Sequence, residues 1–208
     1  MTRLSWGTPG ERFYETGVDR GVLFVNDSGF PWNGLISVQE KSSGGNLSQY
    51  YLDGFNYAQL MAAEEFEATL EAFSSPHEFG PCDGSFELMS GLVVTQQKRK
   101  QFGLSYRTLI GNDINTELGY KIHLVYNALA APSDRTNSTI TDSPDPNTMS
   151  WGITTNPPEL DGIRPTSHFV VDSTKTDPAV LVVLENHIYG TESTSSSLPS
   201  PAELVGMF

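Results

Sequence analysis

Two stretches decide the fold, FGLSYRTLI at residues 102–110 and YKIHLVY at residues 120–126. Successive side chains of a β-strand point to opposite faces, so apolar residues at every second position indicate a strand with one buried face. The alternating positions are Phe102, Leu104, Tyr106, Thr108 and Ile110 in the first stretch and Tyr120, Ile122, Leu124 and Tyr126 in the second. Such strands are typical of an antiparallel sandwich or barrel.

Similar short apolar stretches lie on both sides of this pair, separated by clusters of Gly, Asn, Asp and Pro that indicate turns. We expect strands at 21–25, 34–40, 49–52, 149–155 and 167–172. The sequence therefore predicts a mainly β protein.

One helix is predicted after Asp177, a good N-cap residue, with Pro178 at the first helical position and Gly190 at the end. Its apolar face would pack on the sheet and consist of Leu181, Leu184 and Ile188.

The segment at 64–73 fits two structures. Alternation of Phe66, Ala68, Leu70 and Ala72 with polar residues fits a strand, whereas its Ala, Leu and Glu content favours a helix. On propensity alone, we expect a helix.

Three segments are expected to lack regular structure or to depend on a partner. Residues 41–48 are rich in Gly and Ser and predict a loop, and residues 131–148 form a long polar connection. The chain ends in an apolar stretch at 202–208, which must be buried either against the same chain or on a neighbouring subunit.

The composition bounds the function. The 208 residues suit one domain or two small ones, and 25 acidic against 12 basic residues give a net charge of −13. That negative charge disfavours binding to nucleic acid, but it suits a soluble protein or one that passes near nucleic acid without binding it. A single cysteine, Cys82, excludes an internal disulfide. The sequence shows no apolar leader and no apolar run of membrane-spanning length, so we expect no membrane anchor.

Motifs for chemistry are missing from the sequence. It has no nucleophile elbow and no phosphate-binding glycine loop, so we expect no enzyme, no catalytic residue and no cofactor. The four histidines lack the spacing of a helical zinc site, so we expect no metal, and His123 reads as an ordinary surface or interface residue. The glutamates at 64, 65, 67 and 71 indicate a solvated or interfacial acidic face rather than a hydrolase pair.

Aromatic residues crowd the first quarter of the chain, more than one face of a sandwich would comfortably bury. They are Phe13, Tyr14, Phe30, Trp32, Tyr50, Tyr51, Phe55 and Tyr57. These side chains form either the internal core or an interface with another protein.

Several long runs resemble the major tail tube proteins of long-tailed bacteriophages, especially phages of actinobacteria. The runs are RFYETGVDRGVLF at 12–24, PWNGL at 31–35, YLDGFNY at 51–57, EFEATLEAF at 65–73, PHEF at 76–79, CDG at 82–84, FGLSYRT at 102–108, GND at 111–113, GYKIHLVYN at 119–127 and APS at 131–133. The resemblance covers most of the chain and is weakest at 134–147.

The resemblance implies a single tail-tube domain at 1–208, a β-sandwich or barrel with one or two short helices packed on it. It implies that 65–73 is a strand and that a short helix lies near 76–79. It also implies hexameric rings that stack into a tube, with the loop at 41–48 and the terminal arms at 1–20 and 191–208 bridging rings. Implied partners are further copies of the chain, a tape measure protein, a tail terminator, distal tail or baseplate proteins and the passing double-stranded genomic DNA. The protein would assemble in the host cytoplasm and reside in the virion tail.

In such a tube, strand edges that invite aggregation in a monomer join neighbouring subunits. Acidic side chains on the bore would repel DNA, and Glu65, Glu67 and Glu71 are the candidates. Expected subunit contacts are Phe13, Tyr14, Arg20, Trp32, Arg107, Lys121 and Phe208. The alternative is a virion decoration or carbohydrate-binding β-sandwich module, which would show the same strands and aromatic residues without polymerising.

Overall fold

The computed structural model describes residues 3–133, 135–137, 139, 142 and 146–208. Part of the polar connection expected at 131–148 lies outside these residues. The strands are β1 (Phe13–Val25), β2 (Ser28–Pro31), β3 (Leu35–Gly44), β4 (Leu47–Leu52), β5 (Phe55–Met61), β6 (Glu64–Ala72), β7 (Phe86–Met89), β8 (Leu92–Val94), β9 (Phe102–Asn112), β10 (Gly119–Ala130), β11 (Met149–Thr155) and β12 (His168–Asp172). The helices are η1 (His77–Phe79), α1 (Gly80–Asp83), α2 (Pro178–Tyr189) and α3 (Pro201–Met207).

The fold is mainly β, as predicted, and its main sheet has the antiparallel order β2-β1-β9-β10-β11-β6-β3. The predicted strands at 102–110, 120–126 and 149–155 are confirmed in β9, β10 and β11. Residues 13–20, which we assigned to an N-terminal arm, form the first half of β1.

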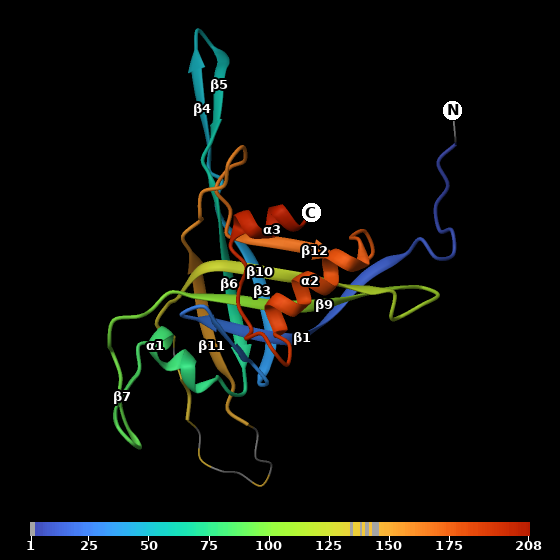
Figure 1. The fold of residues 1–208 in the computed structure, drawn as a ribbon. Coiled ribbons are helices and arrows are strands. Elements are labelled where there is room, and N and C mark those ends of the chain that lie inside the picture. The colour runs from blue at the N-terminus through green and yellow to red at the C-terminus, as the bar shows by residue number, and fades with distance from the viewer. Residues whose placement is uncertain (1–2, 134, 138, 140–141, 143–145) are drawn as a thin grey trace.

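Strand β10 belongs to both halves of the sheet. Its residues 121–125 pair with β12, and its residues 128–130 pair with β11. Between them, the register with β9 shifts and Asn127 takes a positive φ of 51°, which marks a bulge. In Figure 1, β3, β6 and β11 accordingly cross the direction of β1, β9, β10 and β12.

Two cores result from this arrangement. The inner core lies between the crossing halves of the sheet and includes Leu70, Leu104, Tyr106 and Trp151. The second core lies on the other face of β10, beneath α2 and α3.

The predicted helix α2 is confirmed. The Asp177 side chain accepts a hydrogen bond from the Ala179 amide, and the helix ends at Tyr189 with Gly190 as its C-cap. Leu181, Leu184 and Ile188 are buried against the sheet, as expected.

The apolar C-terminus packs on its own chain through α3. Ser200 and Glu203 form a capping box, and Leu204 is buried in the second core. Phe208 remains exposed. Among the described residues, no helix combines the length and the apolarity needed to cross a membrane.

Segment 64–72 is the strand β6, so the helix expected from propensity was wrong and the strand implied by the resemblance is confirmed. β6 pairs with β3 on one side and with β11 on the other. Residues 67–72 lie between two partner strands, whose ladders satisfy their backbone groups, and Ala68, Leu70 and Ala72 are buried. Together these gains outweigh helix propensity.

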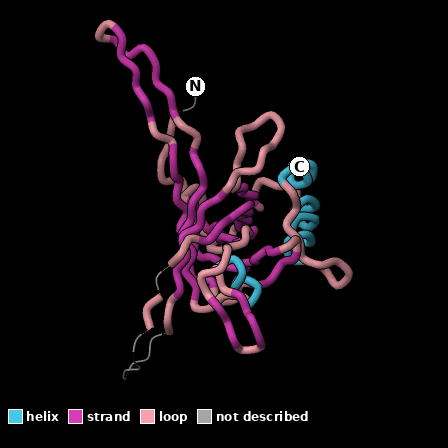
Figure 2. Tube along the Cα trace, turned by 90° about the vertical axis from the view of Figure 1, so that its left-hand side faces the viewer, coloured by secondary structure: helices cyan, strands magenta, loops and turns pink. Residues whose placement is uncertain are grey.

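The prediction of a loop at 41–48 was also wrong. β3 continues to Gly44 and β4 begins at Leu47, while Gly45 and Asn46 hydrogen-bond across to residues 62 and 63. The result is a β4–β5 hairpin, here called the arm (residues 47–61), that projects far beyond the core (Figure 2).

The short helix expected near 76–79 is confirmed as η1, and α1 follows it directly. It inserts Phe79 into the inner core, where the ring contacts those of Trp32, Phe102 and Trp151 at centroid distances of 4.8–5.3 Å.

Helix α2 offers a matched test of the second core. Leu184 is 0% exposed, whereas its neighbour Val183 is 48% exposed. We expect Leu184→Ala to lower the free energy of unfolding by about 3 kcal/mol, because it leaves a cavity beneath the helix. Val183→Ala should change it by less than about 0.5 kcal/mol. Urea denaturation of both variants measures the difference, and equal effects would contradict the described packing.

Candidate assembly surfaces

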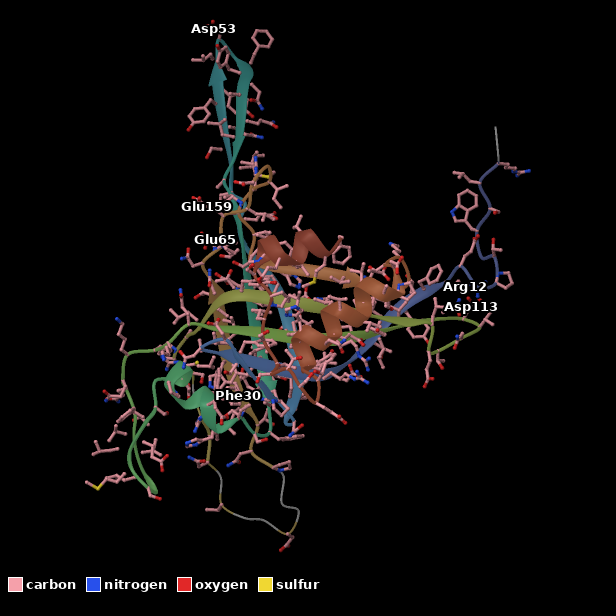
Figure 3. All side chains as sticks on the ribbon, viewed as in Figure 1. Arg12, Phe30, Asp53, Glu65, Asp113 and Glu159 are labelled. Carbon is pink, nitrogen blue, oxygen red and sulfur yellow. The ribbon has the colours of Figure 1, made fainter. Side chains whose placement is uncertain are left out.

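The arm is a two-stranded ribbon with apolar side chains exposed along its length. Its tip is a tight turn in which Asp53 and Gly54 both have positive φ, the conformation favoured in two-residue hairpins. Figure 3 shows that the tip lies far from the body of the protein. The exposed large side chains are Leu47, Tyr50, Tyr51, Leu52, Phe55, Tyr57, Leu60 and Met61. An exposed apolar surface of this extent is typical of a protein contact site.

Other exposed apolar residues lie on further projections. The β7–β8 hairpin exposes Phe86, Leu88, Met89, Leu92 and Val93. The N-terminal segment and the start of β1 expose Leu4, Trp6, Phe13 and Tyr14, and they lie beside the β9–β10 turn, where Figure 3 labels Arg12 and Asp113. The protomer thus extends apolar surface in several directions.

The outward side of β3, β6 and β11 is polar. Ladder partners share a face of a sheet. On the outward side of these three strands, every residue in a ladder pair is hydrophilic or glycine. This polar face consists of Ser37, Gln39, Lys41 and Ser43 on β3, Glu65, Glu67, Thr69 and Glu71 on β6, and Ser150, Gly152 and Thr154 on β11. It carries three carboxylates against one ammonium group and no aromatic side chain.

The three acidic candidates therefore lie together on one surface. Glu67 forms an ion pair with Lys41 at 3.8 Å, and the hydroxyl of Ser37 donates a hydrogen bond of 3.0 Å to Glu71. Glu65 is exposed. The period-two alternation of β6 brings them together, because the intervening side chains enter the inner core.

The three basic candidates are engaged within the chain. Arg107 donates two hydrogen bonds to Asp19, at 2.7 and 2.5 Å, and its guanidinium lies over the ring of Tyr120. The hydrogen bonds to Asp19 raise the pKa of Arg107. Lys121 pairs with Glu15, and Arg20 lies over the ring of Tyr189. These contacts leave Arg107 little capacity for a neighbouring subunit.

The aromatic candidates divide into two groups. Phe13, Tyr14 and Phe208 are exposed, as an interface role requires. Trp32 is only 2% exposed, donates a 2.8 Å hydrogen bond from its indole nitrogen to the Ser74 carbonyl, and contacts Phe79 in the inner core. We therefore remove Trp32 from the interface candidates and assign it to the core.

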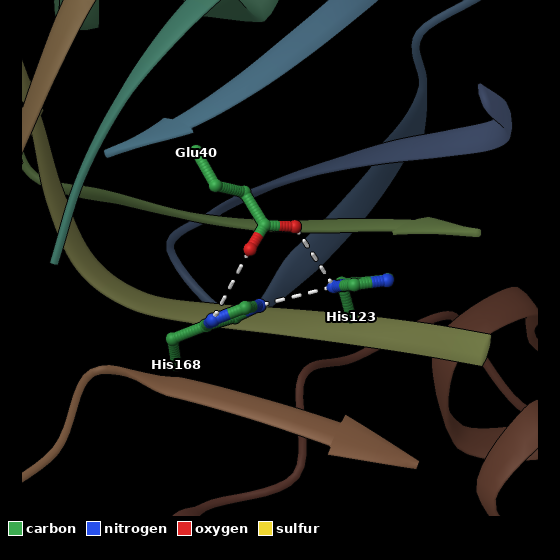
Figure 4. Close-up of side chains that lie close together, drawn as sticks. All are labelled: Glu40, His123 and His168. Carbon is green, nitrogen blue, oxygen red and sulfur yellow. Dashed lines mark hydrogen bonds and ion pairs between the residues drawn. The ribbon is translucent and has the colours of Figure 1, made fainter. Parts of the chain in front are cut away.

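A polar cluster at the end of the inner core escaped the sequence analysis, which interpreted His123 as a surface or interface residue although it is only 5% exposed. Glu40 of β3 lies 3.3 Å from Nδ1 of His123, and that nitrogen lies 3.1 Å from Nε2 of His168 (Figure 4). The hydroxyl of Tyr106 donates a 2.7 Å hydrogen bond to Glu40, and the hydroxyl of Thr108 lies 3.1 Å from Nε2 of His123. Spacing along the chain could not reveal the cluster, because its members come from different strands.

Burial sets the protonation of this cluster. It lowers the pKa of His123 and lowers that of His168 to about 4, because the charged imidazolium is poorly solvated there, although Glu40 opposes both shifts. Burial also raises the pKa of Tyr106, reinforced by its hydrogen bond to Glu40. At neutral pH, both imidazoles are uncharged.

Two of the aromatic candidates give contrasting predictions. Trp32→Ala should lower the free energy of unfolding by about 3–5 kcal/mol, because it removes a large core side chain. Phe13→Ala should change it by about 0.5 kcal/mol or less, because that side chain already contacts solvent. Chemical denaturation of the unassembled protomer measures both values, and a small effect of Trp32→Ala would return that residue to the interface candidates.

Comparison with known proteins finds no matching family model and no matching curated protein. Among solved structures, a chain in the sheath–tube complex of an extracellular contractile injection system (PVC, extended state) is 17% identical, with 81% of this chain and 94% of that chain covered and a TM-score of 0.35. A chain of the anti-feeding prophage baseplate is 11% identical, with 81% and 97% covered and a TM-score of 0.40. A chain of the anti-feeding prophage tube-terminating cap is 12% identical, with 83% and 96% covered and a TM-score of 0.37. We draw no functional conclusion from overlaps at this level.

Proposed function

We propose that this chain is the structural subunit of a phage tail tube. Six copies form a ring, rings stack into a tube, and the bore conducts genomic DNA towards the host. The sequence resemblance to major tail tube proteins suggests this function, and the exposed apolar arm is the observation that carries it.

The arm favours assembly for an energetic reason. Each of its strands pairs only with the other in the described chain, so both outer edges offer free backbone groups. A two-stranded ribbon is at best marginally stable in water, and this one also exposes aromatic side chains such as Phe55 and Tyr57. Contact with neighbouring subunits buries that surface and pairs those edges.

The polar face suits the wall of the bore. Apart from Gln39 and Lys41, its side chains are short or acidic, and none offers a ring on which a base could stack. Six copies multiply the excess of carboxylates around the ring, and like charges keep DNA from adhering. The proposed subunit contacts are formed by the arm, Arg20 and the exposed side chains of Phe13, Tyr14 and Phe208. Lys121 remains a weaker candidate, because Glu15 already pairs with it.

Location and partners follow from the same proposal. The subunit assembles in the host cytoplasm around a tape measure protein, ends at a tail terminator and a distal tail or baseplate complex, and resides in the virion tail. Repulsion between acidic subunits opposes this assembly, and moderate salt weakens that repulsion.

Electron microscopy of the concentrated protein tests the assembly. We expect six-fold rings or striated tubes from the natural chain. The double variant Tyr51→Ser with Phe55→Ser should remain monomeric in sedimentation and keep its thermal unfolding midpoint, because both side chains are exposed in the protomer. The control Val182→Ser, an exposed apolar position on α2, should still assemble. A natural chain that stays monomeric at high concentration would favour the binding-module alternative, which sugar-binding assays could then pursue.

A separate variant tests the bore. Replacing Glu65, Glu67 and Glu71 by Gln should leave tubes intact but slow DNA delivery, because the wall loses its repulsion for phosphates. Cryo-electron microscopy of the tubes should locate these residues on the inner wall, and DNA release measured by dye uptake reports the rate. The control replaces Glu11, Glu117 and Glu192, which are exposed elsewhere, by Gln. Equal release rates would remove these three residues from the bore.

A further inference from the structure

The polar cluster combines three ligand groups of the kind that hold transition metals. Glu40 lies on β3, His123 on β10 and His168 on β12, and their ligand atoms all lie within 4.8 Å of one another. We propose that these three residues bind a divalent transition-metal ion, with zinc preferred, and that the ion ties β3 to β10 and β12.

The two ligand distances from Nδ1 of His123 fit one ion, and the ligand atoms of Glu40 and His168 lie within 4.8 Å of each other. Nδ1 of His123 and Nε2 of His168 are 3.1 Å apart, and Oε1 of Glu40 is 3.3 Å from Nδ1 of His123. Two ligand atoms, each about 2.0–2.1 Å from a tetrahedral zinc ion, lie about 3.3 Å from each other. Two imidazoles and one carboxylate are a common zinc ligand set, with the fourth position open to water.

Neighbouring groups hold the ligands in place, as the residues that hydrogen-bond to the ligands do in known metal sites. Tyr106 donates to Glu40 and stacks on the His123 ring at a centroid distance of 4.5 Å. When Nδ1 of His123 faces the ion, its Nε2–H donates to the hydroxyl of Thr108.

The surroundings admit the ion. The side chain of Glu40 is 42% exposed, so the carboxylate side of the cluster opens to solvent. The nearby ammonium of Lys121 is paired with Glu15 and therefore repels an incoming cation less.

The ion would join parts of the sheet that no ladder joins. In the described chain, β3 pairs only with β6, and β12 pairs only with β10. Glu40 lies four residues before Gly44, where β3 leaves the body and leads to the arm. The ion therefore fixes the root of the arm against β10 and β12.

Isothermal titration calorimetry with zinc chloride tests the site on chelator-treated protein. We expect one ion per chain and a higher thermal unfolding midpoint with zinc, while Mg²⁺, which prefers oxygen ligands, should do neither. His168→Gln and Glu40→Gln should each weaken zinc binding at least about 100-fold, and Thr108→Val about 10-fold. His77→Gln is the control, because His77 lies near Glu87 and could bind zinc weakly elsewhere.

If His168→Gln fails to fold, Glu40→Gln still tests the site. Glu40→Gln retains an oxygen that accepts from Tyr106, and Glu40 is half-exposed, so this variant should fold. Absence of saturable zinc binding, or unchanged affinity in Glu40→Gln, would overturn the site. The titration uses dilute monomer, so failure of tube assembly leaves its outcome unaffected.

Discussion

The structure depends on the backbone hydrogen bonds of β10, which serve two differently directed halves of one sheet. The bulge at Asn127 turns the strand between its pairing with β12 and its pairing with β11. A strand without this bulge would continue in one direction, and its neighbours would form one open sheet. With the bulge, β11, β6 and β3 cross the other strands and enclose the inner core, while α2 covers the opposite face of β10.

Local signals allowed prediction of the elements that depend on local chemistry. Alternation in β9 and β10 and the Asp177 cap of α2 were sufficient, because strand faces and helix ends are encoded by neighbouring residues. β6 could not be predicted from propensity, since its structure depends on ladders with strands that are distant in sequence. The arm was missed because Gly44 and Gly45 indicate a loop. In the structure, both glycines adopt positive φ at the short connection between β3 and β4.

The candidate surfaces were predictable to a similar degree. The glutamates of the polar face could be found from the alternation of one strand, but identifying their partners on β3 and β11 required the register. Trp32 resembled the exposed aromatic residues in sequence, and only its contacts with η1 separate it from them. The cluster of Glu40 with two histidines is a product of tertiary structure alone, because residues 40, 123 and 168 are each on a different strand.

Strand β3 unites these features through its alternation. Gln39 and Lys41 lie on the polar face, whereas Glu40 between them faces Tyr106 and the two histidines. A slip of one residue in the β3–β6 register would exchange the two sides, placing Lys41 against the histidines and Glu40 among the glutamates. Cation repulsion and the loss of the Glu40 carboxylate would then destroy the proposed metal site, and the polar face would lose its one ammonium group. The ladder with β6 therefore specifies the polar face, the cluster and the root of the arm together, so these surfaces cannot vary independently.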